Sequence, residues 1–180
     1  MKTKNIIALI SLSLVFIFNT AAQQKQVNLP AGWRAEEIKL PLSFAPDIPI
    51  TGLEEVRFAP GWGDAESEEY FSYAFVWFLD DPNDLTIEDL EYFLIAYFDG
   101  IMGMVGGFEE VGTFTSLQQN GDFYKGELNT LDGFFTKSEL ILNFTIERLE
   151  EGKVWFFRLS PQPMDHAIWE QLNDEIRLVD

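Results

Sequence analysis

The sequence contains no cysteine and a single histidine, His166. Without thiols the chain has no disulfide, no thiolate metal ligand and no cysteine nucleophile. One imidazole cannot build a His-rich zinc centre, and no serine lies in a G-x-S-x-G elbow. The sequence therefore offers little support for thiol, zinc or Ser–His catalysis, and we do not expect a catalytic role for His166, which follows Asp165 in the first turn of a predicted helix.

Basic residues are also scarce. The chain has 12 Lys and Arg against 30 Asp and Glu, a formal charge of −18. A surface of this sign repels nucleic acid and anionic lipid headgroups, so we expect no nucleic-acid partner. Solubility alone accounts for such a charge, although a cationic partner or metal would also fit it.

Only one segment approaches the length of a membrane span. Ile6–Phe18 is apolar but shorter than the roughly 20 residues that a transmembrane helix needs. Lys2 and Lys4 precede it, and the small residues Thr20 and Ala22 follow, which predicts a signal peptide over 1–22 in preference to an uncleaved anchor. We expect a periplasmic or extracellular product, with no membrane insertion of the mature chain. Cleavage would remove two basic residues and no acidic ones, so the charge would become −20.

The mature chain, 23–180, suits a single domain built mostly from strands. Apolar segments are separated by turn sequences such as "QQNGD", "LDGFF" and "LEEGK", which predict an antiparallel meander of four strands at the C-terminal side. The expected strands are Trp33–Phe44, Leu53–Ala59, Tyr70–Leu79, Val111–Leu117, Phe123–Thr130, Lys137–Glu147 and Val154–Leu159.

The segment 70–79 differs from the other expected strands because both of its faces are apolar. One face carries Tyr73, Phe75 and Trp77, and the alternate face carries Ala74 and Val76. Such a strand belongs in the middle of a sheet that is covered on both sides. We expect the next helix to pack on the face with the smaller side chains, and the aromatic face to serve packing in preference to ligand binding.

Two helices are predicted. Thr86 followed by Asp89 resembles a capping box and starts a helix over 86–105 that ends or frays near Gly100. A second helix follows Pro163, with Asp165 as its expected cap. The predicted fold class is α+β: a predominantly antiparallel β-sheet with one amphipathic helix packed on a face and a C-terminal helix beside it.

The sequence "DDPND" is the nearest approach to a metal motif. Asp80, Asp81, Asn83 and Asp84 could supply oxygen ligands to calcium. Their spacing lacks the alternating order and the distal glutamate of an EF-hand loop. A turn around Pro82 that leads into the helix is the simpler interpretation, and calcium is the alternative.

Aromatic residues in loops have no automatic role in a core. We therefore predict an exported, non-enzymatic binding or accessory domain that holds an unidentified protein or a small apolar ligand through exposed Trp33, Trp62, Phe134 and Phe135. Two alternatives remain open: a hydrolase that works through carboxylates, and an acidic secreted protein stabilised by calcium. Carboxylate pairs are too abundant for the sequence to favour the hydrolase. No cofactor other than calcium is expected, and the sequence does not predict an oligomeric state.

Overall fold

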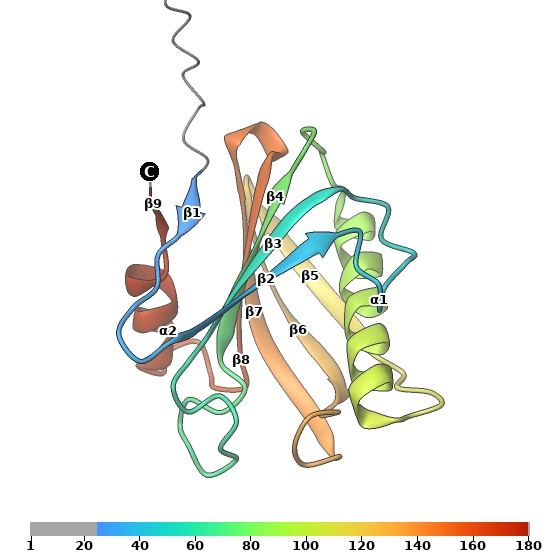
Figure 1. Cartoon of the computed structure of the whole chain (residues 1–180), viewed down its shortest axis with the longest axis vertical. Coiled ribbons are helices and arrows are strands. Elements are labelled where there is room, and N and C mark those ends of the chain that lie inside the picture. The colour runs from blue at the N-terminus through green and yellow to red at the C-terminus, as the bar shows by residue number, and fades with distance from the viewer. Residues whose placement is uncertain (1–24, 180) are drawn as a thin grey trace, which may run out of the picture.

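A computed structural model describes residues 25–179 of the chain. The predicted signal peptide, 1–22, lies outside the described residues. The fold is built on a seven-stranded antiparallel sheet of order β2-β3-β4-β8-β7-β6-β5 (Figure 1). Its strands are β2 (Arg34–Leu40), β3 (Gly52–Phe58), β4 (Tyr73–Leu79), β5 (Phe114–Asn120), β6 (Phe123–Leu131), β7 (Glu139–Leu149) and β8 (Val154–Ser160).

This architecture confirms the α+β fold class and the C-terminal meander. Strands β5 to β8 pair in sequence order, and a short 3₁₀ turn, η1 (Glu150–Gly152), joins β7 to β8. Strand β4 lies between β3 and β8, and all of its residues are buried. The prediction that this strand is covered on both faces is therefore confirmed, although it begins at Tyr73 because Tyr70 and Phe71 belong to a turn.

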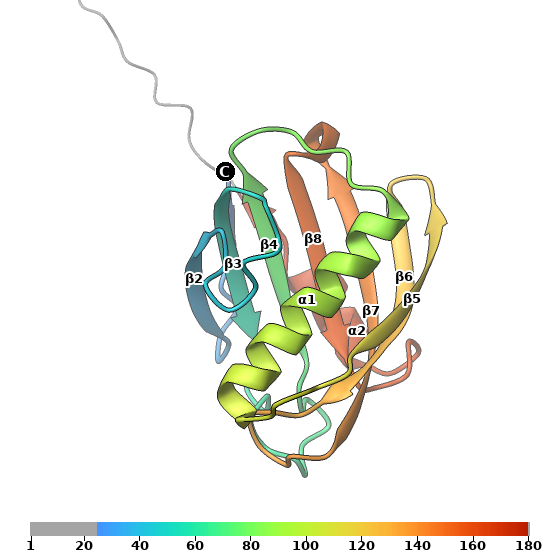
Figure 2. The same cartoon turned by 90° about the vertical axis from the view of Figure 1, so that its right-hand side faces the viewer.

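Helix α1 (Ile87–Gly106) lies diagonally across one face of the sheet (Figure 2). The predicted capping box is present, with both reciprocal bonds between Thr86 and Asp89. The predicted end near Gly100 is wrong, since the helix continues to a left-handed cap at Gly107. Gly100 is needed inside the helix for packing: a Cβ there would lie 2.0 Å from the carbonyl oxygen of Phe44.

The C-terminal helical segment covers the opposite face. It consists of α2 (Ile168–Glu170) and a π-helical turn, η2 (Gln171–Glu175), and it packs on Ala74 and Val76 of β4. Its predicted position beside α1 is therefore wrong. So is the pairing of α1 with the small side chains, because α1 packs on the face of β4 that carries Phe75 and Trp77. Strand alternation separates the two faces but does not say which helix covers which.

The start of the C-terminal segment also differs from the prediction. The Asp165 side chain does not cap α2. Instead, Nδ1 of His166 accepts a hydrogen bond of 3.2 Å from the backbone N–H of Ile168. The His166 ring nitrogen thereby satisfies a backbone donor in the first turn, the place that the sequence predicted for Asp165.

A two-stranded ribbon joins the ends of the described chain. Strand β1 (Gln26–Val27) pairs with β9 (Leu178–Val179). A buried ion pair of 2.6 Å between Arg57 and Glu55 anchors β1 to the sheet: Glu55 accepts from the Val27 N–H, and Arg57 donates to the Asn28 carbonyl.

No helix within residues 25–179 combines the length and apolar character that crossing a bilayer requires.

Candidate functional site: an aromatic cavity between the sheet and helix α1

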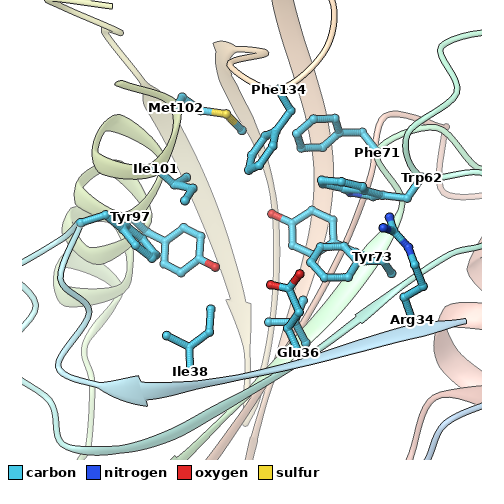
Figure 3. Close-up of a pocket in the computed structure, with 13 residues that line it drawn as sticks. Arg34, Glu36, Ile38, Trp62, Phe71, Tyr73, Tyr97, Ile101, Met102 and Phe134 are labelled. Carbon is cyan, nitrogen blue, oxygen red and sulfur yellow. The ribbon is translucent and has the colours of Figure 1, made fainter. Parts of the chain in front are cut away.

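A cavity of about 200 Å³ lies between α1 and the β2–β3–β4 side of the sheet. Aromatic rings form most of its wall, and two charged side chains stand at its edge (Figure 3). The lining residues are Arg34, Glu36, Ile38, Phe44, Val56, Phe58, Trp62, Phe71, Tyr73, Tyr97, Ile101, Met102 and Phe134.

Strand β2 supplies the open side of the cavity. Because side chains alternate along a strand, Arg34, Glu36 and Ile38 all point to the face that α1 covers. The register places Arg34 opposite Phe58 and Glu36 opposite Val56 of β3. Since β2 is an edge strand, Arg34 and Glu36 are solvent-exposed while their β3 partners line the interior.

The 59–72 loop brings Trp62 into the wall. The Trp62 N–H donates to the Ala59 carbonyl, and the Phe71 N–H donates back to the Trp62 carbonyl, so the loop folds on itself. Phe71 adopts a left-handed backbone conformation with φ of 50°. Burial of its own phenyl ring offsets the strain of this conformation. The Trp62 indole then packs between Phe58, at 4.6 Å between ring centroids, and Phe71, at 5.4 Å.

The 132–138 loop closes the other side of Trp62. One buried carboxylate, Asp132, organises this loop: its oxygens accept hydrogen bonds from the backbone N–H groups of Phe134, Phe135 and Thr136, and from the Tyr70 hydroxyl. The loop thereby holds Phe134 and Phe135 edge-on against Trp62, with ring centroids at 5.3 and 4.9 Å.

The hydrogen bonds in this loop also set the protonation states of Asp132 and Tyr70. Burial alone would raise the pKa of Asp132, but the hydrogen bonds from Tyr70 and Thr136 bring this pKa below its ordinary value. Burial, reinforced by the bond to Asp132, raises the pKa of Tyr70 to about 12. At neutral pH, Asp132 is therefore an acceptor and Tyr70 a donor, which is the combination that fixes the loop.

Behind the cavity wall lies a second buried carboxyl group, Glu54 of β3. Its oxygens accept hydrogen bonds of 2.6 Å from Trp77 Nε1 and 3.0 Å from the Tyr97 hydroxyl. Burial raises the pKa of Glu54 to about 7, against the smaller lowering effect of these two bonds. Glu54 therefore connects β3, β4 and α1 through a group that titrates near neutrality.

Two polar groups of the wall have no partner within residues 25–179. Trp62 Nε1 is buried without a hydrogen bond. The hydroxyl of Tyr73, a residue only 5% exposed, also forms none, and it points toward the space between Tyr97 and Phe134 (Figure 3). Buried donors normally find an acceptor. The Tyr73 hydroxyl could donate to a molecule in the cavity, whereas Trp62 Nε1 is enclosed by the rings packed around it.

The structure gathers three of the four predicted aromatic residues. Trp62, Phe134 and Phe135 form one cluster at the cavity, and Phe134 and Phe135 are exposed at 37% and 38%. The expected exposure of Trp33 and Trp62 is wrong, because they are 6% and 9% exposed. Trp33 belongs to the core on the opposite face of the sheet, in one cluster with Val27 of β1 and Trp169 of α2. Binding of a ligand by these residues remains a prediction.

The DDPND segment forms a turn. The Asp80 N–H donates to the Thr51 carbonyl, the Asn83 N–H donates to the Gly152 carbonyl, and Asp84 pairs with Arg148 at 2.9 Å. In residues 25–179, no group of three or more His, Cys, Asp or Glu side chains converges as a metal site would require. The geometry thus supports the turn interpretation of Asp80, Asp81, Asn83 and Asp84.

Sequence reasoning missed the charged and hydrogen-bonding members of the site. Arg34 and Glu36 stand in an ordinary alternating strand, and Glu54 belongs to an acidic pair like several others in the chain. The only available signal was that Arg34, Glu36 and Ile38 share one face of a strand.

No protein-family model matches the chain, and neither the curated proteins nor the solved structures include a significant match to it.

Proposed function

We propose that the protein is a binding domain that holds a small, mostly apolar ligand in the cavity between its sheet and α1. The observation that carries this proposal is a cavity of about 200 Å³ walled by aromatic side chains, with the Tyr73 hydroxyl left without a hydrogen-bond partner in residues 25–179. Ligand sites are typically concave, largely apolar and furnished with a few polar groups that fix orientation.

The cavity volume limits the size of the ligand. A dry protein cavity of roughly 150 Å³ accommodates a molecule of benzene. A cavity of about 200 Å³ therefore suits one ring with a short substituent, and a polar end of the ligand would reach the mouth between Arg34 and Glu36.

The walls are already in place, which supports a binding role. The Asp132 hydrogen bonds fix the loop that carries Phe134, and the ring contacts of Trp62 hold the 59–72 loop against it. A ligand entering such a cavity would order few side chains, so little of its binding free energy would be lost to conformational entropy.

The carboxylate-based hydrolase remains the alternative. Glu54 has a pKa near the value that general acid–base catalysis uses, but it is not among the residues that line the cavity. Glu36 is the one carboxylate among the described residues that line the cavity, whereas hydrolysis by carboxylates commonly uses two. Ligand binding therefore explains the lining of the cavity with fewer assumptions. Export, predicted from residues 1–22, would let the domain meet its ligand in the periplasm or outside the cell.

The test uses a cavity-filling variant and a matched control. Ile101→Trp adds bulk inside the cavity from α1, whereas Ile141→Trp makes the same change at a β7 position that is 44% exposed and does not line the cavity. Indole and ethylbenzene are titrated into each protein while the tryptophan indole N–H signals are followed by NMR.

We expect both probes to shift the Trp62 signal in the wild type and in Ile141→Trp, and to leave it unmoved in Ile101→Trp. Wild-type protein in which neither probe moves the Trp62 signal would contradict the proposal. Equal responses from Ile101→Trp and Ile141→Trp would contradict it as well.

A further inference from the structure

Two opposite charges stand side by side at the cavity mouth without pairing. Arg34 and Glu36 occupy alternate positions on the same face of β2, so about 7 Å of strand separates them. Neither side chain forms an ion pair or hydrogen bond within residues 25–179. In Figure 3 the Glu36 carboxylate points into the cavity, and the Arg34 guanidinium lies next to Trp62.

The position of Arg34 is set by aromatic rings. Its guanidinium carbon lies 5.6 Å from the ring centroid of Phe58 and 5.5 Å from that of Trp62. Cation–π contacts of this kind orient a guanidinium but leave its N–H donors free. Carboxylates are abundant in this chain, with 30 Asp and Glu, and yet none of those described engages Arg34.

One hydrogen-bonding group deeper in the wall, the Tyr73 hydroxyl, favours an acceptor on the ligand. Burial, with a smaller contribution from Glu54, raises the pKa of Tyr73 well above its ordinary value, so its hydroxyl stays protonated. Tyr73 is then a neutral donor that points toward the space between Tyr97 and Phe134, and its hydroxyl has no partner in the described part of the chain. A polar atom of the ligand that reaches this side of the cavity would give the Tyr73 hydroxyl an acceptor.

We infer that the cavity takes a small aromatic zwitterion, one ring on a short chain that carries a carboxylate and an ammonium group. The ring would fill the aromatic cavity, the carboxylate would meet Arg34, and the ammonium would meet Glu36. This inference rests on the proposed function, because it names the ligand class for the same cavity. The inference explains why the cavity mouth carries both charges. An aromatic ligand with only a carboxylate would place that group near Glu36 as well as near Arg34, and a ligand with only an ammonium would place it near Arg34 as well as near Glu36.

The experiment compares four probes that share a ring and differ in charge: phenylalanine, 3-phenylpropionate, 2-phenylethylamine and ethylbenzene. Their dissociation constants for the full chain are measured at low salt by NMR titration. Each surface-accessible ion pair contributes enough for about a fivefold change, so phenylalanine is expected to bind at least that much more tightly than each of the others.

Charge-neutral variants assign the two ends of the ligand. Arg34→Gln is expected to weaken phenylalanine and 3-phenylpropionate by about fivefold and to strengthen 2-phenylethylamine. Glu36→Gln is expected to weaken phenylalanine and 2-phenylethylamine and to strengthen 3-phenylpropionate. The control is Glu37→Gln, an exposed carboxylate on the same strand that does not line the cavity, and it should leave all four dissociation constants unchanged.

The outcomes separate this inference from the proposed function. If ethylbenzene or a singly charged probe binds as tightly as phenylalanine, the cavity is a binding site but the zwitterion inference is wrong. If no probe binds, the proposed function fails together with the inference. If Glu37→Gln changes affinity as much as Glu36→Gln, the effect comes from the overall negative charge, and the inference is overturned.

Discussion

Replacing Glu54 by glutamine should stabilise the protein at neutral and alkaline pH and have little effect in acid. Glu54 is buried between β3, β4 and α1, where Trp77 and Tyr97 both donate to its oxygens. A glutamine can keep this geometry, because its carbonyl oxygen accepts from Trp77 and its amide nitrogen can donate to the Tyr97 oxygen.

The magnitude follows from the shift in pKa. The folded protein holds the Glu54 proton up to a pKa of about 7, whereas the ordinary value is 4.5. A raised carboxyl pKa means that the folded state is fully favoured below pH 4.5 and loses stability as the pH rises from 4.5 to 7. At about 1.36 kcal/mol per pKa unit, ionisation of Glu54 costs about 3 kcal/mol above pH 7.

The assay is thermal and urea unfolding of wild type and Glu54→Gln between pH 4 and pH 8. The two proteins should have nearly equal stability at pH 4 and should diverge with rising pH, reaching roughly 6 to 12 °C in Tm at pH 8. Glu37→Gln, which removes an exposed carboxylate from β2, should show no such divergence. The reasoning is refuted if Glu54→Gln is the less stable protein at pH 8, since Glu54 would then be an ionised group that its two donors stabilise.

Three further predictions concern packing, the 132–138 loop and the acidic turn. Gly100→Ala should destabilise the protein although alanine favours helices, because the new Cβ would lie 2.0 Å from the Phe44 carbonyl oxygen; Gly103→Ala, whose nearest contact is 3.7 Å, should gain up to about 1 kcal/mol in urea unfolding, and equal effects would contradict this packing. Asp132→Asn should cost about 1–3 kcal/mol at pH 7 by leaving buried donors unsatisfied. Because the folded pKa of Asp132 is lowered, this difference should shrink as the pH falls through that pKa, and a difference that is independent of pH would refute the assignment. Calcium should raise the Tm no more than magnesium does, because Asp84 is paired with Arg148; a calcium-selective rise would restore the metal hypothesis.

The secondary structure could be predicted where its signals are local. Reciprocal bonds between Thr86 and Asp89 need only four consecutive residues, so the start of α1 was readable from sequence. The meander depends on turns between neighbouring strands, which short sequences also encode. Gly100 resembles a helix terminator in the sequence, but inside α1 it makes room for the Phe44 carbonyl, and no local pattern reports a contact with a residue more than fifty positions earlier.

The candidate site could be predicted only in part, for the same reason. The sequence identifies Phe134 and Trp62 as aromatic residues in loops, but the contact between their rings depends on Asp132. In the sequence Asp132 resembles an ordinary turn residue, whereas in the structure its carboxylate accepts five hydrogen bonds. Trp33 has the same composition signal as Trp62 and lies on the other face of the sheet. Glu54 shows no sequence signal at all, since burial, and not residue type, gives it an unusual pKa.

The β1–β9 ribbon makes the described chain nearly circular. Gln26 lies directly opposite Val179, so both ends of the described residues meet at one place (Figure 1). A short peptide linker could join them, and new termini could be opened at the exposed β5–β6 turn around Gly121. The fold is thus a candidate for circular permutation, in which the order of the strands along the chain would change while their order in the sheet would not.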